Sequence, residues 1–187
     1  MQRDLVERAQ AGDHDAFTLL VRESLPRAYR VAKLILREED RAQDAVQEAF
    51  VAAWRDVRAL RNPDAWESWL HRLVVRACYR SAHAVRRRSV VELHVTPDVE
   101  PARAADELET IADRDQVEGA LERLPIDQRT VAVLHFYLDL PLTEVAAIVG
   151  IPVGTAKSRL HRGLEALRRD IVRDRPTSTT APREPSA

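Results

Sequence analysis

A glycine-centred turn between two helical patterns, within residues 142–169, is the feature that most constrains this chain. Residues 142–149 are predicted to form a short helix, with Thr143 as its cap. Gly150 follows directly, where a left-handed backbone costs least. Pro152 stands near the first turn of the next helix, as proline often does. A short helix, a glycine turn and a longer helix together predict a helix-turn-helix.

The second helix of this unit has one apolar face and one polar face. Small and apolar residues recur at helical spacing on the inner face, with Ala156 small enough for a close helix crossing. Lysine and arginine on the outer face can neutralise phosphates while the first turns reach base edges. The alternative is a surface helix with a solvated basic face. The outer face holds Thr155, Lys157, Ser158, Arg159, His161 and Arg162.

Helical periodicity also dominates the rest of the chain, so we predict an all-α fold of two small domains. Asp13 or Asp15 is expected to cap an early helix. Proline and acidic residues interrupt the pattern after residue 88, although the stretch Val90-Val91-Glu92-Leu93 could be briefly extended. We predict a first helical domain over 1–88, an acidic linker over 89–109, a helix-turn-helix domain over 110–172 and a disordered tail over 173–187.

The charge is sorted along the chain, although the formal net charge is only −1. Residues 71–88 carry a net charge of +6 and residues 128–187 a net charge of +3, whereas residues 89–127 carry −8. Two positive segments separated by an acidic one predict two surfaces that face polyanions.

An acidic and amide-bearing face is predicted on the helix around residue 48. Asp44, Gln47 and Glu48 share one face with residue 51, because side chains three and four residues apart lie together on a helix. Phe50 and Trp54 point elsewhere and are assigned to the core. From spacing alone, this face is either a protein interface or a solvated surface.

The sequence argues against an enzyme, a metal site and a cofactor site. The six histidines show no paired metal-ligand spacing, and neither a nucleophile elbow nor a phosphate-binding glycine loop occurs. Cys78 is the only cysteine, which excludes an internal disulfide, and its place on an apolar helix face predicts a small buried residue. No membrane span or signal peptide is evident, so we expect a soluble cytoplasmic protein.

Several segments resemble, in the right order, the extracytoplasmic-function (ECF) subgroup of bacterial RNA polymerase sigma factors. The run Asp44-Ala-Val-Gln-Glu48-Ala-Phe50 resembles their core-polymerase-binding helix, and residues 66–80 resemble their promoter-melting helix. The segments 142–146 and 152–162 resemble their second DNA-binding domain. The resemblance spans roughly residues 10–172.

This resemblance implies a transcription initiation factor that binds core RNA polymerase and promoter DNA, with no small-molecule substrate. Asp44, Gln47 and Glu48 would face the polymerase. The promoter-melting helix would hold the minus-ten element through positive charge and flat groups. Trp69 fits either base stacking or core packing, and core packing is favoured. The charged candidates for the minus-ten element are His71, Arg72, Arg76, Arg80, Arg86, Arg87 and Arg88.

Two further expectations come from matching residues to the family. In the minus-thirty-five reading helix, Lys157, Ser158 and His161 are the base-edge candidates, whereas Thr155, Arg159 and Arg162 would contact phosphates. Family members often carry Asn and Asp where this chain has Arg76 and Arg80, which predicts an unusual promoter preference.

The sequence does not identify any partner other than core polymerase and promoter DNA. Many members of the family are held inactive by an anti-sigma factor, but no residue here identifies one. Two rival interpretations remain open: a standalone helix-turn-helix regulator, and an interaction module that holds a partner through the acidic helix. Only the sigma-factor interpretation requires binding to core polymerase.

Overall fold

A computed structural model describes residues 2–91, 119, 121 and 123–174. The described residues form helices and no strand, which confirms the all-α prediction. The segments 92–118 and 175–187 lie outside the described residues, and with them most of the linker and tail expected from the sequence.

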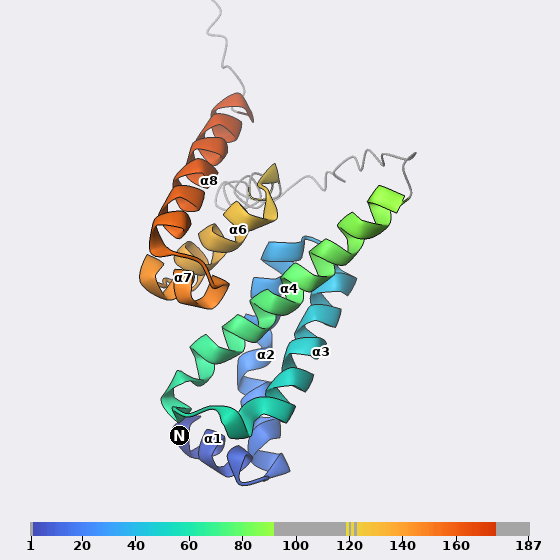
Figure 1. The fold of residues 1–187 in the computed structure, drawn as a ribbon, viewed down its shortest axis with the longest axis vertical. Coiled ribbons are helices and arrows are strands. Elements are labelled where there is room, and N and C mark those ends of the chain that lie inside the picture. Colours follow the sequence, from blue (N-terminus) through green and yellow to red (C-terminus); the bar gives the residue numbers. More distant parts are fainter. Residues whose placement is uncertain (1, 92–118, 120, 122, 175–187) are drawn as a thin grey trace, which may run out of the picture.

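Four helices form the first part of the molecule, here called the α1–α4 bundle (Figure 1). α2 (His14–Leu36), α3 (Glu39–Asp56) and α4 (Trp66–Val91) pack side by side, and α1 (Gln2–Gln10) lies across one end against α2. The short turns η1 (Val57–Ala59) and η2 (Pro63–Ala65) connect α3 to α4.

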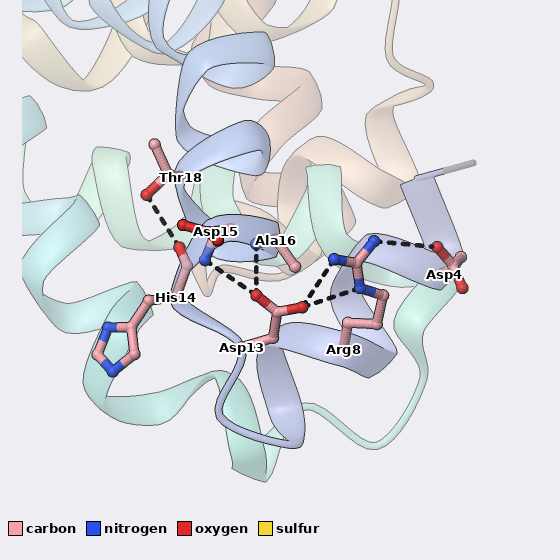
Figure 2. Close-up of polar contacts among 7 residues, drawn as sticks. All are labelled: Asp4, Arg8, Asp13, His14, Asp15, Ala16 and Thr18. Carbon is pink, nitrogen blue, oxygen red and sulfur yellow. Dashed lines mark hydrogen bonds and ion pairs between the residues drawn. The ribbon is translucent and has the colours of Figure 1, made fainter.

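The start of α2 is fixed by Asp13 (Figure 2). Its carboxylate accepts hydrogen bonds from the backbone N–H groups of Asp15 and Ala16, at 2.9 and 3.0 Å, and from the Arg8 guanidinium at 2.7 Å. The Ala16 N–H bond and the Arg8 bond hold the pKa of Asp13 below its usual value. Of the two caps that the sequence allows, Asp13 is therefore the one used.

Aromatic residues close the core of the bundle near the start of α4. Trp66 is fully buried, and its indole N–H donates to the Ser24 hydroxyl at 3.1 Å. The Trp69 ring centroid lies 5.7 Å from that of Trp66, and Trp69 packs against the core, as favoured from the sequence. Cys78 is also fully buried, and this burial raises the pKa of its thiol to about 12.

In the part of the chain from residue 126 to 174, the helices form a second unit, here called the α6–α8 unit. α6 (Ile126–Ala132) continues into a π-helical turn, η3 (Val133–Tyr137), followed by α7 (Leu142–Val149) and α8 (Val153–Asp174). Gly150 adopts the left-handed conformation, φ 78°, that the sequence predicted between α7 and α8. The helix-turn-helix prediction is confirmed.

Two local expectations are wrong. Thr143 does not cap α7, because the helix begins at Leu142, as predicted, so that Thr143 is its second residue and Pro141 occupies the cap position. Val90 and Val91 are helical, not extended, because α4 continues to Val91, and the other two residues of that stretch, 92 and 93, lie outside the described residues. The acidic residues and prolines that interrupt the helical pattern start at Glu92, directly after α4 ends.

Two glycines of the helix-turn-helix should respond oppositely to alanine. Gly154 has open space where a Cβ would stand and lies in the first turn of α8, so Gly154→Ala should raise the free energy of unfolding by about 0.5 kcal/mol. Gly150 has equally open space but a positive φ, so Gly150→Ala should lower it by about 1 kcal/mol. Urea denaturation of both variants measures the difference, and equal effects would show that the backbone conformation at Gly150 is not the constraint.

Candidate nucleic-acid interface

The acidic face of α3 forms as the sequence predicts. Asp44, Gln47 and Glu48 are exposed, whereas Ala45 and Ala49 on the opposite side are buried. The small alanines let α3 pack closely on its neighbours and leave the polar side chains directed outward. These three residues therefore form one accessible surface, here called the α3 face.

An apolar groove adjoins the α3 face. It has a volume of about 810 Å³ and lies between α2 and α3, with Val21, Leu25, Pro26, Phe50 and Val51 among its lining residues and Gln47 at its edge. Leu25 and Val51 are 43% and 54% exposed, which is unusual for adjacent large apolar residues. Sequence reasoning assigned Phe50 to the core and did not find the groove. The signal was available in Val51, which shares the α3 face.

The basic residues of α4 are distributed unevenly between solvent and interior. Arg76 and Arg80 are exposed, whereas Arg72 is half-buried, and its Nε atom is buried without a hydrogen-bond partner. The helix extends through Arg86, Arg87 and Arg88. α4 thus carries positive charge along most of its length, as the charge sorting predicted.

His71 does not lie on this basic surface, and its predicted position there is wrong. It is only 4% exposed, because residue 71 falls on the same helix face as the buried Val74 and Cys78. Burial lowers its pKa, with Arg27 acting in the same direction and Glu67, 4.0 Å away, opposing. His71 is part of the interior of the bundle.

The burial of His71 predicts an acid-sensitive fold. Because its pKa in the folded chain is below the value of 6.5 in the unfolded chain, the unfolded state binds the proton more readily, and stability should fall as the pH drops through 6.5. His71→Gln should reduce this loss. Urea denaturation at pH 8 and pH 5.5 checks it, and an unchanged pH dependence in the variant would contradict the assignment to His71.

Arg80 joins the α3 face to the basic surface of α4. Its guanidinium Nε and Nη2 atoms lie 3.0 and 2.9 Å from a carboxylate oxygen of Glu48. Both side chains are about half exposed, so the pair stabilises the fold by at most about 1 kcal/mol. Either partner can therefore exchange this contact for another ligand at little cost.

The outer face of α8 is largely exposed to solvent at its N-terminal end, and its polar contacts are with residues of α8 itself. Lys157, Ser158, His161 and Arg162 are exposed, and Thr155 is half-buried. Arg159 differs, because its Nη2 atom lies 3.0 Å from a carboxylate oxygen of Asp127 at the start of α6, and only 22% of its side chain is exposed. This ion pair joins α8 to α6.

The described residues hold neither a metal-binding cluster nor a membrane-spanning helix. No group of three or more His, Cys, Asp or Glu side chains there is arranged to hold a metal ion. None of the described helices combines the length and apolar character that crossing a bilayer requires.

A helical bundle with a basic helix, joined to a helix-turn-helix unit, is the arrangement expected of a DNA-binding protein. Two family models agree: sigma-70 region 2 matches residues 20–89, and sigma-70 region 4 matches residues 114–167. The chain belongs to the ECF RNA polymerase sigma factors.

Individual ECF sigma factors are similar to this chain over most of its length. The ECF sigma factor SigM of Mycobacterium tuberculosis is 33% identical over 166 residues, covering 89% of this chain and 82% of SigM. The ECF sigma-E factor of Escherichia coli is 34% identical over 175 residues, covering 87% of this chain and 90% of sigma-E. RpoE of Bartonella quintana, solved in complex with the anti-sigma factor NepR, superposes with a TM-score of 0.64 at 25% identity, covering 85% of this chain and 98% of RpoE.

Proposed function

We propose that this ECF sigma factor docks on core RNA polymerase through the α3 face and directs the enzyme to promoters with α4 and α8. The observation that carries the proposal is the α3 face itself, where Asp44, Gln47 and Glu48 stand exposed together beside an apolar groove. A surface that combines exposed polar side chains with an apolar groove can bind a helix of a partner protein. The protein catalyses nothing itself, and we place it in the cytoplasm with the polymerase.

The basic surface of α4 is proposed to hold the minus-ten strand once the duplex opens. Arg76 and Arg80 lie one helical turn apart and are exposed, so they can follow the phosphates of a single strand. Arg86, Arg87 and Arg88 continue the same helix toward its end and are assigned to the same task. Polymerase that engages Glu48 would also release Arg80 from its ion pair and make it available to DNA.

The N-terminal turns of α8 are proposed to read the minus-thirty-five duplex. Lys157, Ser158 and His161 are the base-edge residues, and Arg162 and Thr155 contact phosphates. Arg159 is assigned to holding α8 in position and not to a phosphate, because its guanidinium already forms an ion pair with Asp127. Two weak DNA contacts on one polymerase-bound chain reinforce each other through effective concentration.

An anti-sigma factor is proposed as a further partner. RpoE of Bartonella quintana has been solved with NepR, and its fold covers most of this chain.

Copurification with core polymerase tests the central proposal. The chain should elute with the core enzyme in gel filtration, and elution apart from it at micromolar concentration would overturn the proposal.

A further inference from the structure

The first residue of the recognition helix presents an apolar side chain to solvent. α8 begins at Val153, and this side chain is 45% exposed. The next apolar positions of the helix face inward, since Ala156 is fully buried and Leu160 is only 7% exposed. Among residues 153–169, Val153 is the only large apolar side chain that stands exposed. Its spacing of three residues from Ala156 would place it on the inner face, so its exposure follows from the packing of the helix and not from the sequence pattern.

Helix geometry determines where the Val153 side chain points. The Cα–Cβ bonds of a helix tilt toward its N-terminus, so a residue of the first turn directs its side chain beyond the end of the helix. The first turn of α8 is well formed, because the backbone N–H groups of Thr155 and Ala156 both donate to the Pro152 carbonyl, at 2.9 and 3.0 Å. In helix-turn-helix proteins, the space ahead of such a turn is filled by base edges of the major groove.

Val153 also continues the row of side chains already assigned to base edges. Lys157 and His161 follow it at intervals of four residues, and all three side chains are exposed. Residues four apart lie one above the other on the same side of a helix. Val153 therefore adds an apolar end to a row that is otherwise polar.

The tip of the helix-turn-helix around Val153 has no polar side chain. Residues 150–154 are Gly, Ile, Pro, Val and Gly, and none of these side chains can donate or accept a hydrogen bond. Open space surrounds the position that a Cβ of Gly154 would take, so no neighbouring side chain covers the tip on that side. The side chains of this tip can therefore contact a base only through apolar surface.

The major groove offers one apolar feature to such a surface. Thymine carries a methyl group at C5, whereas the other groups that distinguish the base pairs there are hydrogen-bond donors and acceptors. Small apolar side chains contact this methyl group in protein–DNA complexes. The branched apolar side chain of Val153 therefore has the chemistry that recognises a thymine.

We propose that Val153 is a specificity-determining residue that selects a thymine in the minus-thirty-five element by packing against its 5-methyl group. This proposal rests on the sigma-factor function described above, and it adds a base contact that the polar side chains of α8 do not supply. Four residues of helix rise about 6 Å, and base pairs repeat every 3.4 Å or about that, so the thymine lies within about two base pairs of the pair that Lys157 reads.

Replacing thymine by deoxyuridine tests the contact, because the replacement removes only the 5-methyl group. The preferred minus-thirty-five duplex is first selected with the native, polymerase-bound protein, and each thymine on either strand is then replaced in turn. Loss of one buried methyl group should weaken binding about fourfold at one position and leave the other positions nearly unchanged. Competition between the two duplexes for the polymerase-bound protein measures this ratio.

Two variants at position 153 assign the effect to this side chain. Val153→Ala should bind the thymine duplex about fourfold more weakly and should no longer distinguish thymine from deoxyuridine. Val153→Ile keeps a β-branched apolar side chain and should keep the distinction. Leu19→Ala is the matched control, because Leu19 is 43% exposed on α2, outside the helix-turn-helix, and this variant should behave like the native chain.

The outcomes separate this contact from the sigma-factor function. If the selected duplex contains no thymine, or if deoxyuridine weakens binding equally for the native chain and Val153→Ala, the contact is wrong and the sigma-factor function stands. A methyl-sensitive position more than two base pairs from the pair at which Lys157→Ala relaxes the preference would contradict the contact as well. A polymerase-bound protein that selects no sequence at all would overturn the proposed function itself, and this contact with it.

Discussion

Replacing Asp44, Gln47 and Glu48 together by alanine is expected to weaken binding to core RNA polymerase about 100-fold. All three side chains are exposed on the α3 face, and their removal leaves the buried alanines beneath them untouched. A few residues of an interface commonly carry most of its binding energy. The dissociation constant measured by fluorescence anisotropy with labelled protein gives the effect.

The control for this variant removes the same amount of negative charge elsewhere. Asp4 and Glu7 are exposed acids on α1, so Asp4→Ala with Glu7→Ala matches the charge change without touching α3. This control should bind polymerase like the native chain. Equal weakening in both variants would indicate a general charge effect and would contradict a specific α3 interface.

Lys157→Ala should weaken binding to the preferred minus-thirty-five duplex about tenfold to 100-fold and should relax the preference at one base pair. Lys157 is exposed in the second turn of α8, where a recognition helix reaches base edges. Selection from a duplex library randomised over the upstream element, with the polymerase-bound protein, measures both the affinity and the preference.

Arg162→Ala provides the contrast, because Arg162 is assigned to a phosphate. This variant should bind every sequence more weakly by a similar factor, and the slope of affinity against salt should fall by about one. If Lys157→Ala instead weakened all sequences uniformly, Lys157 would be a phosphate contact and the base-reading role would pass to Ser158 or His161.

Local chemistry explains which features could be predicted from the sequence. The left-handed turn at Gly150 depends on one residue and its neighbours, and the α3 face depends only on helical spacing around Gln47. His71 was misplaced because its basic character was given more weight than its spacing. It lies three and seven residues before Val74 and Cys78, which is the pattern of a buried position.

The relation between the two parts was beyond local reasoning. Tyr79 and Thr130 come together although the segment 92–118 separates their helices in the sequence, and no periodicity within either helix encodes that contact. The α2–α3 groove was missed for a related reason, since its walls come from two helices. Surfaces built by several elements need the packing of the whole molecule.

Mapping transcript starts in a defined reaction tests the sigma-factor function most directly. Purified protein is added to core RNA polymerase and genomic fragments, and the 5′ ends of the transcripts are sequenced. New starts should appear only with the protein present, preceded by shared sequence blocks near positions minus ten and minus thirty-five, and the α3-face variant should lose them. An unchanged set of starts, with the protein binding DNA but not polymerase, would contradict the sigma-factor function and favour a standalone regulator.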